Sequence, residues 1–121
     1  ELAAEAGAQA IVVSNHGGRV LDHTPGTAEV LPAIAARVKG RVVIMVDGGV
    51  RTGTDVLKLL ALGADQVLVG RPLLVAAVGG GAEGVKLAVE KLIAELKVAM
   101  ILTGTPDIAA ALPRILSPER S

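Results

Sequence analysis

The sequence predicts an α/β fold built around a small parallel sheet. Short apolar runs rich in Val and Ile alternate with longer segments of helical periodicity. The chain also contains a short internal repeat. Ala6-Gly7-Ala8 is followed by Ile11-Val12-Val13, and Leu62-Gly63-Ala64 is followed by Val67-Leu68-Val69. In each copy a helix end, a glycine and a buried strand follow one another, which is the pattern of a repeated β/α unit.

Three strands are predicted, over residues 9–14, 42–46 and 66–69. Right-handed helical crossovers would make them consecutive neighbours in a parallel sheet. All three runs are apolar on both faces, so both faces of the sheet are expected to be buried. Three strands cannot close a barrel of eight. If the helices all cover one face, as in the wall of a barrel, the other face is left uncovered. We therefore expect self-association, or an open sheet with helices on both faces.

Helical signals fill the spaces between these strands. The chain opens on a helix end over residues 1–6, which predicts further chain upstream. A second helix is predicted over 28–38. Thr52-Gly53-Thr54-Asp55 has the form of a capping box at the start of a third helix, which runs to Leu62 and ends at Gly63.

The longest predicted helix covers residues 82–102 and follows Gly79-Gly80-Gly81, a run that indicates a flexible joint. Lys91 and Glu95 have the spacing of an i,i+4 ion pair on its solvent side. A short helix is predicted over 107–112, and the end of the chain is rich in proline and charge and is expected to fray.

Composition excludes several classes of function. Twelve basic and 12 acidic residues balance, and this lack of a basic excess argues against a nucleic-acid partner. No apolar run reaches bilayer length and no signal peptide opens the chain, so we expect no membrane partner and a cytoplasmic location. Without cysteine the chain forms no disulfide and no thiolate metal site. No metal ligand set is predicted.

The sequence contains no Phe, Tyr or Trp. Aromatic side chains normally contribute large buried areas, so this core depends on Val, Leu, Ile, Ala and Met. One hypothesis is a simplified, designed or reconstructed sequence; the other is chance variation in composition.

Two glycine-bearing loops mark the candidate site. Asp47-Gly48-Gly49 follows the second predicted strand, and Gly70-Arg71 follows the third. Ligands bind at the carboxyl ends of parallel strands, and glycines let main-chain amides approach a ligand. Arg51 and Arg71 supply guanidinium groups, whose fork geometry suits phosphate. The sequence therefore predicts a phosphate cradle shared by two consecutive strand ends.

A more specific signature extends over much of the chain. Its segments are Ser14-Asn15-His16-Gly17-Gly18-Arg19, Leu21-Asp22, Asp47-Gly48-Gly49-Val50-Arg51, Gly53, Asp55, Ala61-Leu62-Gly63-Ala64 and Gly70-Arg71-Pro72. In this order and spacing the chain closely resembles the FMN-dependent α-hydroxy-acid oxidases and dehydrogenases, the family of glycolate oxidase and lactate oxidase. The match covers residues 1–104 and leaves 105–121 as a C-terminal tail.

The resemblance implies a fold, a cofactor and a set of roles. The family fold implies a partial (β/α)8 TIM barrel, with about the last three β/α units present, and FMN is the implied cofactor. His16 corresponds to the catalytic base, and Arg19 to the arginine that binds the substrate carboxylate. The implied cofactor-binding residues are Ser14 at the flavin ring, Asp47, Gly48, Gly49 and Arg51 at the ribityl and phosphate loop, and Gly70 and Arg71 at the phosphate.

The chain also departs from the family pattern. The family's flavin-facing lysine and active-site tyrosines come from parts that this chain lacks, and Leu73 stands where the family usually has an aromatic residue. The resemblance therefore implies that the residues of the family's phosphate site are present in this chain. The ring and substrate region is represented only by Ser14, His16 and Arg19.

Three functional hypotheses follow. The first is an FMN-binding fragment of an α-hydroxy-acid oxidoreductase, which acts on a small 2-hydroxy acid as a homo-oligomer or beside a complementing barrel fragment. The second is a catalytically inert engineered or reconstructed fragment with at most phosphate or FMN binding. The third, a phosphate-binding β/α piece of another enzyme class, is disfavoured by the His16-Gly17-Gly18-Arg19 loop.

Overall fold

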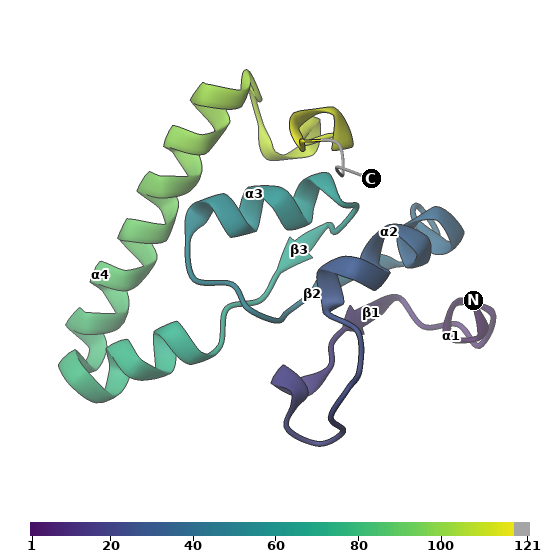
Figure 1. Ribbon diagram of the computed structural model, residues 1–121, viewed down its shortest axis with the longest axis horizontal. Helices are drawn as coiled ribbons and strands as arrows, with labels where there is room; N and C mark the ends of the chain where they lie inside the picture. Colours follow the sequence, from purple (N-terminus) through teal and green to yellow (C-terminus); the bar gives the residue numbers. More distant parts are fainter. Residues whose placement is uncertain (118–121) are drawn as a thin grey trace.

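The computed structural model describes residues 1–117 and contains a three-stranded parallel sheet in the order β1-β2-β3 (Figure 1). The register pairs Ile11 with Ile44 and Met45 with Gln66. The three predicted strands are confirmed, each somewhat shorter than predicted. Their bounds are Ala10–Val13 for β1, Val43–Val46 for β2 and Gln66–Val67 for β3.

Helices connect the strands in the predicted β/α order. The crossover from β1 to β2 contains α2, and the crossover from β2 to β3 contains α3. The chain after α4 folds back onto α3 through two 3-10 turns, so the helix predicted over 107–112 is a single such turn (Figure 1). The predicted frayed end, residues 118–121, lies outside the described residues. The bounds are α1 Leu2–Glu5, α2 Thr27–Val38, α3 Gly53–Ala61, α4 Arg71–Thr103, and turns Ile108–Ala110 and Pro113–Ile115.

The main core lies between one face of the sheet and the helices α2 and α3. Ile44 and Val46 of β2 and Leu31 of α2 are completely buried there. Because side chains alternate along a strand, Val43 and Met45 point to the other face. The helices therefore cover the sheet from one side only.

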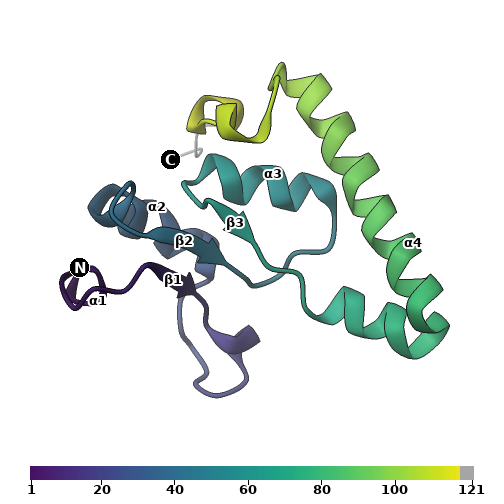
Figure 2. The ribbon, with the colours of Figure 1, turned by 180° about the vertical axis from the view of Figure 1, so that it is seen from behind.

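The opposite face of the sheet is open to solvent. Val12, Val43 and Leu68 are 49%, 41% and 39% exposed. Within residues 1–117 no helix lies over these strands on that side (Figure 2). The expectation that both faces are buried is therefore wrong for this part of the chain, and so is the open sheet with helices on both faces. Apolar residues on both sides of a strand predict that both faces of the sheet are covered, but they do not identify the segments that cover them.

The helix α4 differs most from its prediction. It begins at Arg71, because Pro72 favours a first helical turn and the amides of Leu73 and Leu74 bond to the carbonyl of Gly70. The predicted joint at 79–81 lies at Gly81 alone, since Gly79 and Gly80 continue the helix, and the helix predicted from residue 82 is confirmed as the second part of α4. Only Gly81, with φ +56° and ψ −143°, interrupts it. At this corner the chain turns and the second part of α4 packs along α3 (Figure 1).

Candidate functional site

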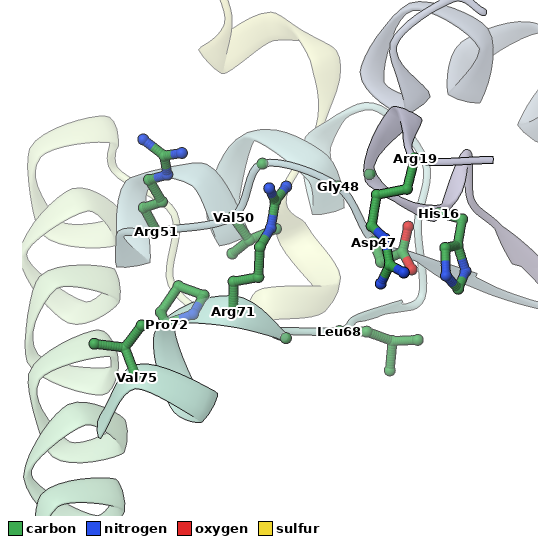
Figure 3. Close-up of a pocket in the computed structure, with 13 residues that line it drawn as sticks. His16, Arg19, Asp47, Gly48, Val50, Arg51, Leu68, Arg71, Pro72 and Val75 are labelled. Atoms are coloured by element: carbon green, nitrogen blue, oxygen red, sulfur yellow. The ribbon is translucent and has the colours of Figure 1, made fainter. Parts of the chain in front are cut away.

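A cavity of about 680 Å³ lies where the three strands end (Figure 3). Its lining comes from the loops after β1 and β2 and from the start of α4. The structure gathers eight of the nine predicted site residues around it: His16, Arg19, Asp47, Gly48, Gly49, Arg51, Gly70 and Arg71. The ninth, Ser14, does not line the cavity but contacts a residue that does: its Oγ donates a hydrogen bond to Asp47 Oδ2 at 2.9 Å.

The loop between β1 and α2, residues 15–26, forms one side of the cavity, and we call it the histidine loop. It begins with three consecutive residues of positive φ, His16, Gly17 and Gly18, at 54°, 67° and 73°. This conformation is unusual for histidine and is held by Asn15, whose Oδ1 accepts the Gly17 amide and whose Nδ2 donates to the Pro25 carbonyl. The side chain of His16 is exposed as a result.

The turn after β2 presents Asp47 at the base of the cavity. Its main-chain carbonyl accepts a hydrogen bond from the hydroxyl of Thr27, a buried residue at the start of α2. Gly48 is left-handed at φ +103°, and a Cβ there would lie 2.6 Å from Thr27 Oγ1. Glycine is therefore required by both conformation and space. Asp47 Oδ1 is buried and has no hydrogen-bond partner among residues 1–117.

The start of α3 is fixed by the predicted capping box. Thr52 Oγ1 accepts the Asp55 amide, and Asp55 Oδ2 accepts the amides of Thr52 and Arg51 at 2.9 and 3.0 Å. Burial alone would raise the pKa of Asp55. The hydrogen bonds from Arg51 and Thr52 and the charge of Lys58 outweigh that effect and lower the pKa below its ordinary value.

Two arginines give the cavity its positive charge. Arg51 precedes α3 and Arg71 begins α4, and neither forms an ion pair within residues 1–117. Figure 3 shows both on the side of the cavity away from His16. The guanidinium of Arg71 lies so close to the histidine loop that a Cβ on Gly17 would be 3.3 Å from its Nη2. We call residues 47–55 and 70–72 the phosphate half of the site.

Sequence reasoning missed two residues that support the site. Thr27 carries no local signal of its contact with Asp47, since the two are 20 positions apart. Glu95, assigned from its spacing to the solvent side of its helix, accepts the Gly53 amide at 2.9 Å. Its predicted pair with Lys91 is also present at 3.7 Å. No local pattern predicts contacts that depend on how separate elements pack.

The family model for FMN-dependent dehydrogenase matches residues 1–118. The chain belongs to this family.

Curated relatives are about half identical to the chain. A 2-hydroxyacid oxidase of Dictyostelium discoideum is 52% identical over 109 residues, which are 90% of this chain and 28% of that protein. An L-lactate oxidase of Lactobacillus jensenii is 53% identical over 107 residues, 88% of this chain and 26% of that protein. A peroxisomal (S)-2-hydroxyacid oxidase of Arabidopsis thaliana is 49% identical, with coverages of 88% and 29%. The chain thus spans less than a third of the length of these relatives.

Solved structures give the same result for the fold. A mandelate oxidase with benzoyl-formic acid matches at TM-score 0.88 and 49% identity, over 91% of this chain and 33% of that chain. A mandelate oxidase mutant with a monooxide FMN adduct matches at TM-score 0.89 and 49% identity, over 91% and 35%. The chain is therefore an α/β fragment that matches part of a TIM barrel. No helix among the described residues is long and apolar enough to span a membrane.

Proposed function

We propose that the chain is the FMN-binding part of an α-hydroxy-acid oxidoreductase, which converts a small 2-hydroxy acid to the 2-oxo acid. The observation that carries the proposal is the cavity at the strand ends, which Asp47, Arg51 and Arg71 line together with His16 and Arg19. Family membership adds the FMN-dependent chemistry.

The residues of the phosphate half fit the polar part of FMN. Arg51 and Arg71 carry positive charge without an acidic partner in residues 1–117, so a phosphate meets no competing ion pair. Gly49, at φ +72°, has open space where a side chain would stand, which leaves room for a ligand near the main chain. The buried Asp47 Oδ1 lacks a donor, and a hydroxyl of the ribityl chain would satisfy it.

The histidine loop carries the groups suited to the substrate. Arg19 would bind the substrate carboxylate through two parallel N–H donors. His16 would take the hydroxyl or α-proton of the 2-hydroxy acid on an imidazole nitrogen. FMN, when bound, supplies the redox chemistry by accepting the electrons of the oxidised substrate.

The open sheet face supports a partner that supplies the rest of a barrel. Val12, Val43 and Leu68 would face its interior, and within residues 1–117 no further strand pairs with the outer edges of β1 and β3. Copies of three strands cannot add up to eight, so complementing β/α units, in a longer protein or a second fragment, fit better than a homo-oligomer. A cytoplasmic location stays a prediction.

A titration of the full chain with FMN, followed by flavin fluorescence, tests the proposal. We expect saturable binding that inorganic phosphate weakens and that Arg51→Ala or Arg71→Ala lowers about tenfold or more, since each removes a charge-assisted contact. Arg41→Ala is the matched control, because Arg41 is exposed at the opposite end of β2. Riboflavin, which lacks the phosphate, should bind equally to all four proteins.

Turnover of lactate or glycolate with an artificial electron acceptor separates an enzyme from an inert fragment. Activity that His16→Ala abolishes supports the assigned base. Activity that survives this change contradicts it. Absence of FMN binding at high protein concentration would favour the second hypothesis, an inert barrel fragment.

A further inference from the structure

Three successive main-chain amides at the start of α3 donate hydrogen bonds to carboxylate side chains. Those of Arg51 and Thr52 donate to Asp55 Oδ2, and that of Gly53 donates to Glu95 Oε2. Free amides at a helix N-terminus are a common anion site. Here the amides of residues 51–53 are occupied by carboxylates, so these three are not available to an anion, and the guanidinium groups of Arg51 and Arg71 remain as its cationic partners.

Glu95 reaches this position from a different helix, 42 residues further along the chain. Its side chain is only 30% exposed, and its second oxygen, Oε1, lies 3.7 Å from Lys91 Nζ. The contact forms where the start of α3 packs directly against the main chain of α4. Gly53 is buried there, and a Cβ would overlap the main chain of Leu92 and Leu96. Glycine at 53 therefore lets Glu95 reach the amide.

We propose that Glu95 is a positioning residue that fixes the main chain of Arg51–Gly53 and so aims the Arg51 guanidinium at the phosphate. This inference rests on the proposed function. Asp55 holds the first two amides from within α3, and Glu95 holds the third from α4. With both ends of this segment anchored, its main-chain dihedral angles cannot rotate freely, and the Cα–Cβ bond of the exposed Arg51 leaves it in one direction.

The sign of the effect separates positioning from simple electrostatics. Glu95 is negative, so if only charge mattered its removal would strengthen phosphate binding, in Glu95→Ala and Glu95→Gln alike. If Glu95 acts through the Gly53 hydrogen bond, Glu95→Ala weakens binding despite the lost negative charge. Glu95→Gln keeps a carbonyl oxygen that accepts the amide, and should retain wild-type affinity.

The experiment is a titration of the full chain with inorganic phosphate, followed by amide shifts in NMR spectra. We expect Glu95→Ala to weaken phosphate binding roughly tenfold and Glu95→Gln to stay within about twofold of wild type. Glu90→Ala is the matched control on the exposed side of α4. Lys39→Ala controls for stability, because Lys39 bonds to Gly63 and Asp65 at the other end of the sheet.

Hydrogen exchange of the Gly53 amide gives a second readout that needs no ligand. It should be slow in wild type and Glu95→Gln, and fast in Glu95→Ala. Exchange that is unchanged in Glu95→Ala overturns the proposal, as does phosphate binding at least as tight as wild type. If the wild-type chain binds no phosphate, the proposed function fails, and the exchange rates alone then decide whether Glu95 fixes this segment.

Discussion

Two regions line the cavity, the phosphate half and the histidine loop, and they differ in how far they are buried and hydrogen-bonded to the rest of the described chain. In the phosphate half, Val50 is 5% exposed, Gly53 is buried, and the amides from 51 to 53 are all bonded. In the histidine loop, Val20 and Leu21 are 79% and 69% exposed. Both regions carry predicted site residues. The phosphate half is packed against α4, whereas the histidine loop is held mainly by hydrogen bonds within itself.

This difference shows that a segment can carry the residues of a motif without the packing that holds them in place as a site. The phosphate half depends on α3 and α4, which the chain itself supplies. The loop that carries His16 and Arg19 has few neighbours, since the adjoining sheet face is bare. We therefore expect phosphate binding to survive in this chain more readily than substrate binding. Paired substitutions, one in each region, test this comparison.

The largest effect is expected at Gly53. In Gly53→Ala the new Cβ meets main-chain atoms of α4, which cannot move aside as a side chain would. We expect the free energy of unfolding to fall by about 3 kcal/mol, because α3 and α4 must separate. Urea unfolding followed by far-ultraviolet circular dichroism measures this, since the chain has no aromatic residue to report by fluorescence.

Gly18→Ala in the histidine loop is the matched control. Its Cβ would stand in open space but at φ +73°. The left-handed conformation alone costs about 1 kcal/mol for alanine. Equal losses in the two variants would contradict the view that the phosphate half is the better packed region.

The second largest effect is expected at Asp55. Asp55→Ala removes the acceptor for the amides of Arg51 and Thr52 and should cost about 2 kcal/mol at neutral pH. Asp22→Ala is the control in the histidine loop, where an exposed carboxylate accepts only the neighbouring His23 amide, and should cost about 0.5 kcal/mol. Urea midpoints of the two variants give the comparison.

The pH dependence of Asp55→Ala has a definite sign. The pKa of Asp55 is lower in the folded chain than its ordinary value of 3.8, so folding is stabilised when the group is ionised. This contribution is fully present above 3.8 and disappears as the pH falls through the folded value. The difference in stability between wild type and variant should therefore shrink on acidification. A difference that stays constant to low pH would contradict the carboxylate's role.

Sequence patterns predicted what depends on neighbours along the chain. The three strands, their parallel order and the Thr52–Asp55 capping box follow from local periodicity and spacing. It also follows that Asp47, Arg51 and Arg71 line one cavity, because parallel strands end at one edge of the sheet.

Contacts between distant elements could not be predicted in this way. Glu95 has the spacing of a surface ion pair, and only the packing of α4 on α3 turns it towards Gly53. The helical start of α4 was hidden by glycines of low helix propensity, yet Pro72 and the Gly70 carbonyl fix its first turn. The segments that cover the bare sheet face could not be predicted, because a strand that is apolar on both faces does not identify what lies across from it.

A smaller effect is expected at Thr27, whose hydroxyl supports the turn that carries Asp47. Thr27→Val keeps the buried volume but leaves the Asp47 carbonyl without its donor, and should cost about 1 kcal/mol. The matched change in the histidine loop is Thr24→Val, where a 3.4 Å bond to the Leu21 carbonyl is lost near solvent, and should cost a few tenths of a kcal/mol. Thermal unfolding of both variants, at one protein concentration, tests the order.

Apart from the control variants, the smallest effect on stability is expected at Ser14, which lies between the two regions. Its hydroxyl donates to Asp47 Oδ2 and accepts the amide of His16. Within residues 1–117 no other side-chain hydrogen bond joins residues 14–26 to the phosphate half. Because these groups are exposed, Ser14→Ala should cost only about 0.5 kcal/mol.

Hydrogen exchange locates the consequence of Ser14→Ala more sharply than stability does. The His16 amide should exchange faster, because it loses its acceptor, while the Gly53 amide should keep its wild-type rate. That outcome means the phosphate half holds its shape without the histidine loop. Faster exchange at Gly53 as well would mean that Asp47 transmits the disturbance to α3. The two regions would then form one cooperative unit, and a chain with a loosened histidine loop would bind phosphate less well too.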